Sequence, residues 1–106
     1  MIITLTSIKV LAASFCVQMG LAACPRVVDA QDDPHAHPSS LAYYSEDRNV
    51  VGFDIQAMQE QGLQAREVKL LTVHELAHAR HKSNPHSELS HHGAEWTEIY
   101  HRYRDL

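Results

Sequence analysis

One short segment carries the strongest structural signal in this chain. His74-Glu75-Leu76-Ala77-His78 has the pattern H-E-x-x-H. In a helix, residues four positions apart lie on the same face, so His74 and His78 can direct both imidazoles at one ion. Glu75 lies about 100° further round, where its carboxylate can reach an attacking water without binding the metal. The spacing therefore predicts two zinc ligands and a general base on one helix.

The residues around this segment distinguish it from a solvated histidine-rich tract. The chain holds nine His among 106 residues, so the pattern alone could arise by chance. Apolar side chains surround it, however, as in a helix with one buried side, namely Leu70, Leu71, Val73, Leu76 and Ala77. The pattern predicts a helix from about Ala65 to Lys82, which Asn84 and Pro85 end.

Length and composition are those of one small globular domain. Of the 106 residues, 21% are charged and 44% are hydrophobic, which are ordinary proportions. The formal net charge is −4, so the chain offers no basic surface for nucleic acid or anionic lipid. We therefore expect no nucleic-acid partner.

The first 23 residues have the pattern of a secretory leader. They contain no Asp or Glu, and Lys9 is their one charged side chain. An apolar stretch follows Lys9 and ends in small residues, as in a signal peptide that is removed. A retained membrane anchor is the alternative, although the apolar stretch is barely long enough to span a bilayer.

Two cleavage sites are possible at the end of this leader. Residues 21–24 read LAAC and are similar to a bacterial lipobox, in which the cysteine is lipidated and begins the mature chain. Ordinary signal peptidase would instead cut after Ala30, at the small-x-small sequence VDA. Either cut removes Cys16, so we expect no disulfide in the mature chain. We expect a secreted or cell-envelope protein, attached to the membrane through lipidated Cys24 in the first case.

A polar segment interrupted by prolines follows the leader. Residues 24–40 are expected to form a flexible tether, in which His35 and His37 are solvated linker residues. The expected organisation is therefore a signal peptide at 1–23, a tether at 24–40 and a folded domain at 41–106. So small a domain buries a marginal core, and bound zinc would add to its stability.

The remaining elements predict a small α+β fold. Two β-rich runs, at 41–44 and 50–55, flank a turn-like stretch and predict a hairpin. A short helix is expected over Gln56–Gln61, started by Asp54 and ended at Gly62, and another over Gly93–Tyr103. Because two strands alone are barely stable, we expect the hairpin or a small sheet to pack on the motif helix and the C-terminal helix.

A catalytic zinc needs a third protein ligand, which must follow the motif helix. The available side chains are His86, His91, His92, Glu95 and Glu98. Here the chain resembles the SprT-like (Spartan-type) zinc metallopeptidases, because residues 74–78 (HELAH) are followed by residues 92–96 (HGAEW). In that family a third histidine follows a loop in an H-G-x-x-aromatic stretch, and the resemblance covers residues 41–106.

The resemblance implies a small zincin-like metallopeptidase core in which His74, His78 and His92 bind Zn²⁺. Glu75 would then be the general base in the hydrolysis of a protein or peptide substrate. The helix that usually precedes the sheet in that family is expected to be absent here, replaced by the tether. Many relatives act on DNA-bound proteins, a role against which the leader and the acidic charge argue.

Two kinds of alternative stay open. Glu98 lies twenty residues after His78, a spacing similar to that of thermolysin-like gluzincins, in which a glutamate completes the zinc site. We expect His92 rather than Glu98 because the H-G-x-x-W context matches. The alternative functions are a non-catalytic zinc-binding envelope protein and an anchored structural protein that binds no metal.

Overall fold

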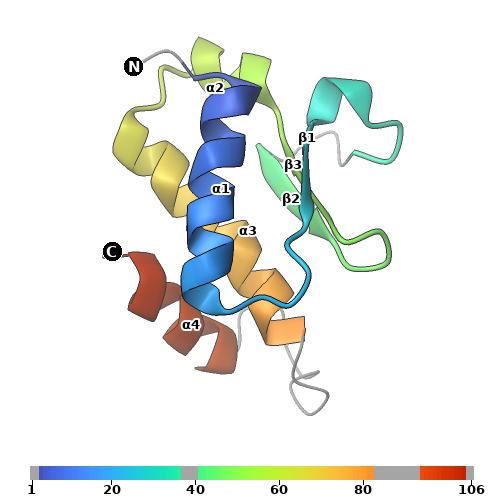
Figure 1. Ribbon diagram of the computed structural model, residues 1–106. Coiled ribbons are helices and arrows are strands. Elements are labelled where there is room, and N and C mark those ends of the chain that lie inside the picture. Colours follow the sequence, from blue (N-terminus) through green and yellow to red (C-terminus); the bar gives the residue numbers. More distant parts are fainter. Residues whose placement is uncertain (1–2, 37–40, 83–93, 105–106) are drawn as a thin grey trace.

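A computed structural model of the protein describes residues 3–36, 41–82 and 94–104. It has a small α+β fold in which helices lie beside a three-stranded sheet (Figure 1). In chain order the elements are α1 (Leu5–Met19), β1 (Arg26–Asp29), the 3₁₀ helix η1 (Ala30–Asp32), β2 (Ala42–Ser45), β3 (Val50–Phe53), α2 (Ile55–Glu60), α3 (Ala65–Lys82) and α4 (Ala94–Arg104). Helix α3 packs against α1, α4 and strand β2.

The sheet has the strand order β1-β3-β2. Strands β2 and β3 are antiparallel, with Ser45 opposite Val50, and a four-residue turn joins them. Asn49 ends this turn with a φ of 51°, a left-handed conformation that Asn tolerates. The predicted hairpin is therefore confirmed. Strand β1 adds to the other edge of β3 in parallel, with Arg26 opposite Val50.

The hydrophobic core lies between the sheet and the helices. Val51 and Phe53 of β3 are fully buried, and they pack in one cluster with side chains of α1, α2 and α3. Helix α2 begins at the predicted cap, because the Asp54 side chain accepts a hydrogen bond from the Ala57 amide at 3.1 Å. Gly62, with a φ of 66°, follows this helix as predicted.

Helix α1 belongs to this core. Thr4 and Ser7 form a capping box at its start, and Gly20 adopts a left-handed conformation at its end. Its buried side faces α3 and comprises Ile8, Ala12, Phe15, Cys16 and Met19. The expectation that no helix precedes the sheet is wrong, because this apolar segment folds as a helix with one buried side. Among the described residues, no helix is both long and apolar enough to cross a bilayer.

A disulfide joins α1 to the start of the sheet. Cys16 in the last turn of α1 is bonded to Cys24, with 5.7 Å between the two Cα atoms. A chain cut before Cys24 was expected to lack a disulfide, but the full chain forms one because α1 carries Cys16 to the strand β1 side. Removal of residues 1–23 stays a prediction.

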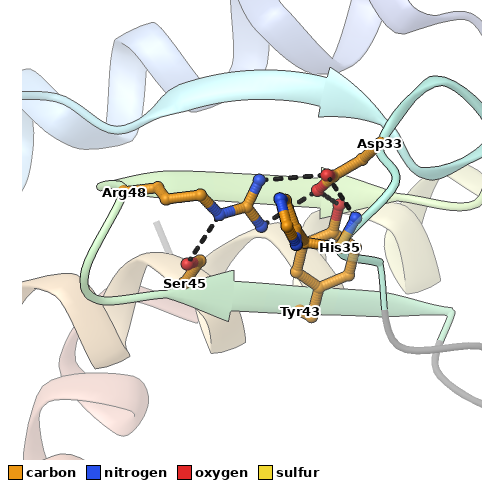
Figure 2. A network of polar contacts seen from close by, with 5 residues as sticks. All are labelled: Asp33, His35, Tyr43, Ser45 and Arg48. Atoms are coloured by element: carbon orange, nitrogen blue, oxygen red, sulfur yellow. Dashed lines mark hydrogen bonds and ion pairs between the residues drawn. The ribbon is translucent and has the colours of Figure 1, made fainter.

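The expected tether is also largely structured. Residues 26–29 form β1, and the chain then crosses the sheet face opposite the core, where Asp33 meets the β2–β3 hairpin (Figure 2). Both Asp33 carboxylate oxygens accept hydrogen bonds from Arg48, at 3.0 Å each, and one accepts from the Tyr43 hydroxyl. The Asp33 side chain is only 5% exposed. Residues 37–40 lie outside the described structure.

The Asp33 contacts predict a specific pH dependence of stability. The Arg48 hydrogen bonds, and then that of Tyr43, hold the Asp33 pKa well below its usual range. Asp33 therefore stabilises the fold above about pH 4, the pKa of an unfolded Asp, and this contribution is lost as the pH falls further. We expect the melting-temperature difference between wild type and Asp33→Asn to shrink below about pH 4. Exposed Asp32→Asn should follow the wild-type profile, and a constant Asp33→Asn difference down to pH 2 would contradict this account.

Gly52 makes room for the Tyr43 ring. The two residues are directly opposite in the sheet, and a Cβ atom added to Gly52 would lie 2.0 Å from the Tyr43 Cζ atom. We expect Gly52→Ala to displace the ring and its contact with Asp33, which lowers the melting temperature by several degrees. In a Tyr43→Ala background the same substitution should cost much less, because the clash is gone. Equal costs in both backgrounds would refute this role.

Candidate metal centre

Helix α3 carries the candidate site on its partly exposed side. Its bounds, Ala65–Lys82, confirm the predicted motif helix. Its first turn is secured by Glu67, whose side chain accepts a hydrogen bond from the Gln64 amide at 3.0 Å. The opposite side is fixed in the core by fully buried residues, namely Val68, Thr72, Val73, Leu76 and Ala77. This burial fixes the rotation of α3 and therefore the direction of its histidines.

His74, Glu75 and His78 come together as the sequence predicts. One ligand atom of each side chain lies within 4.8 Å of those of the other two. The two imidazole centroids are 5.2 Å apart, and the ring planes meet at 72°. Both histidines are partly exposed, whereas Glu75 is buried. The helix thus presents two nitrogen ligands at the surface with a carboxylate beside them.

The Glu75 carboxyl group is buried away from solvent. It is 5% exposed, and burial raises its pKa to about 7. Its Oε2 atom lies 4.0 Å from the His74 Nε2 atom. A divalent cation held by the two histidines would favour the ionised carboxylate, because an opposite charge lowers the pKa of an acid. Two imidazole ligands with a buried carboxylate beside them therefore fit a zinc ion with a general base next to it.

Helix α4 places one aromatic side chain beside the metal-binding cluster. The Tyr100 ring meets the His74 ring edge to face, with centroids 6.0 Å apart. The Arg104 guanidinium carbon lies 6.0 Å from the Tyr100 ring centroid. From the sequence, Tyr100, Tyr103 and His101 are candidates to assist the reaction, although packing or capping of the last helix is the expected role of each. The helical spacing of Tyr100 and Tyr103, which both pack on the core, was the available signal that this side of α4 faces inward.

The candidates for the third ligand lie partly outside the described residues. His92, the predicted ligand, lies outside them, as do His86 and His91. Glu98 is described, and its side chain is 70% exposed and paired with Arg102 at 2.8 Å. Glu98 also lies about 200° round α4 from Tyr100, away from the helix side that meets His74. The structure thus does not bring Glu98 to the cluster, and the assignment of His92 stays a prediction.

Comparison with known proteins found a structure of similar fold but no sequence match. No protein-family model matches the chain, and no curated protein sequence matches it. The fold is similar to a crystal structure of the metallopeptidase zymogen of Methanocaldococcus jannaschii jannalysin, with a TM-score of 0.67 and 12% sequence identity. The similarity covers 91% of this chain and 80% of that one. At this identity the similarity is one of fold.

Proposed function

We propose that this protein is a zinc metallopeptidase that hydrolyses peptide bonds in a protein or peptide substrate. The observation that carries the proposal is the position of His74 and His78 on the partly exposed side of α3, with the buried Glu75 carboxyl group beside them. The similarity of the fold to a metallopeptidase zymogen supports the same reaction class. Among such enzymes, the HELAH and HGAEW segments favour a SprT-like site with His92 as the third ligand.

The residues of the chain divide the reaction between them. His74, His78 and His92 would hold the zinc, which supplies a Lewis acid and a water of lowered pKa. Glu75 accepts a proton from the attacking water and later delivers it to the leaving amine. Burial raises the pKa of Glu75, and a cation beside it would lower the pKa again, so that the carboxylate is ionised and able to accept a proton when the metal is bound. Burial of Leu76 and Ala77 behind the cluster keeps the two histidines in place.

The disulfide supports a location in an oxidising compartment. Disulfides persist in secreted and envelope proteins and are rare in a reducing cytosol. The Cys16–Cys24 bond therefore favours a secreted or cell-envelope location, whether or not the leader-like segment is removed. No nucleic-acid role is proposed, because the chain has a formal charge of −4.

Chelation and metal return test the proposed activity. The full chain, loaded with one equivalent of zinc, should release fluorescent peptides from a labelled unfolded protein. We expect o-phenanthroline to stop this release and added zinc to restore it, because the attacking water depends on the metal. A chain that binds zinc stoichiometrically but releases no peptides would instead support the non-catalytic zinc-binding alternative.

A further inference from the structure

We propose that α1 is retained as a permanent layer of the working domain. On this inference, the Cys16–Cys24 disulfide keeps α1 in place even if the chain is cut between the two cysteines. The segment has the composition of a leader, yet the structure uses it as the helix that supports α3. The proposal concerns the folded domain and stands whether or not the metal centre is a peptidase.

Helix α1 has one buried side and one exposed side, as a helix that packs on a core does. Ile8 is fully buried and Phe15 is 3% exposed on the side that packs against α3. On the opposite side Val17 is 82% exposed. Loss of α1 would uncover the apolar side of α3 behind His74 and Glu75. A leader that is cleaved and removed would not need a side that packs against the mature domain.

A further contact joins the start of α1 to α2, and local hydrogen bonds cap its end. The Gln59 side chain of α2 donates a hydrogen bond to the Ile3 carbonyl at 2.6 Å, next to the start of the helix. At the other end, the amides of Gly20 and Leu21 donate to carbonyls in the last turn. The chain then returns directly to β1, so α1 and the sheet share one continuous core.

The disulfide spans the leader-like cleavage site. A cut before Cys24 would fall between the two bonded cysteines, so hydrolysis there would leave residues 1–23 attached through sulfur. Formation of this bond removes two protons and two electrons from the two thiols, which a protein disulfide of an oxidising compartment accepts. Cys24 has a single sulfur atom, so a disulfide to Cys16 and a lipid thioether exclude each other. Retention of α1 by the disulfide is thus the alternative to lipidation.

The mass of the protein recovered from its own cells gives the first test. We expect a non-reduced species that contains residues 1–23, and reduction should add about 2 Da because two thiols form. If the chain is nicked, the non-reduced mass should still contain this segment, and reduction should release it. A mature species that begins at Cys24 with lipid on its sulfur, or that begins after Ala30, would overturn the proposal.

Two substitutions on opposite sides of α1 give the second test. On the purified full chain, Phe15→Ala should lower the melting temperature by more than about 10 °C, because it leaves a cavity against α3. The matched Val17→Ala should change it by less than about 2 °C, because Val17 is exposed. Phe15→Leu covers the case in which Phe15→Ala fails to fold, with an expected loss of several degrees. Equal melting temperatures for all of these variants, with and without zinc, would show that α1 is not part of the core.

Discussion

Replacing Glu75 with glutamine is expected to abolish peptide hydrolysis while zinc stays bound. The substitution keeps the size of the side chain but removes the group that takes a proton from the attacking water. Glu75 is 5% exposed, so no solvent-borne base easily takes its place. We expect a loss of at least a hundredfold in kcat/KM, about the minimum that a general base contributes. Hydrolysis of a labelled unfolded protein and elemental analysis of the same sample measure the two quantities together.

A matched substitution separates this effect from a general one. Glu60→Gln makes the same chemical change at an exposed residue of α2, where the side chain accepts a hydrogen bond from Gln56. Its activity and zinc content should equal those of the wild type. Wild-type activity in a clean preparation of Glu75→Gln would exclude Glu75 as the base. Loss of zinc from Glu75→Gln would instead make Glu75 a ligand.

Replacing His92 with alanine is expected to remove most of the bound zinc. Two imidazoles alone hold zinc weakly, because structural and catalytic zinc sites in proteins both use at least three protein ligands. We expect the zinc affinity to fall at least a hundredfold, measured by competition with a chromogenic chelator. Activity should fall with the zinc and return in part at high zinc concentration, because His74, Glu75 and His78 remain.

The neighbouring histidine and the rival glutamate provide the controls. His91→Ala makes the same change one residue away, and it should keep the wild-type affinity. Glu98→Ala should also keep it, because this side chain is 70% exposed and paired with Arg102. Full zinc binding by His92→Ala together with loss in Glu98→Ala would contradict the assignment and make Glu98 the third ligand.

The local elements of the fold were predictable from sequence because their signals are local. The bounds of α3 follow from apolar spacing, and those of α2 from an Asp cap and a Gly end. The hairpin follows from two β-rich runs on either side of a short polar turn. In each case the residues that decide the structure lie within a few positions of one another.

The N-terminal third was not predictable in this way. An apolar helix with small residues after it has the same composition whether it is discarded or buried, and only its packing on α3 separates the two outcomes. Strand β1 has four residues and pairs with β3 across more than twenty positions, so no hairpin turn announces it. The role of Asp33 depends on Arg48 and Tyr43, which only the folded hairpin brings to it.

The candidate site also has one part that the local sequence predicts and another part that depends on how the helices pack. His74, Glu75 and His78 lie within five residues of one helix, so helical geometry alone places them together. The Tyr100 ring reaches His74 from a different helix, and that contact depends on how α4 packs against α3. The third ligand is likewise a non-local choice, because it must come from a segment beyond α3.

Zinc per chain, measured by elemental analysis on the purified full-length protein and on His78→Ala, tests the metal centre most directly. The full chain is needed because α1 is part of the core. We predict about one zinc in the wild type and a large loss in His78→Ala, since that substitution removes one of two imidazoles whose ligand atoms lie within 4.8 Å of each other. A folded wild-type protein that holds no zinc after incubation with the metal would contradict the metallopeptidase account.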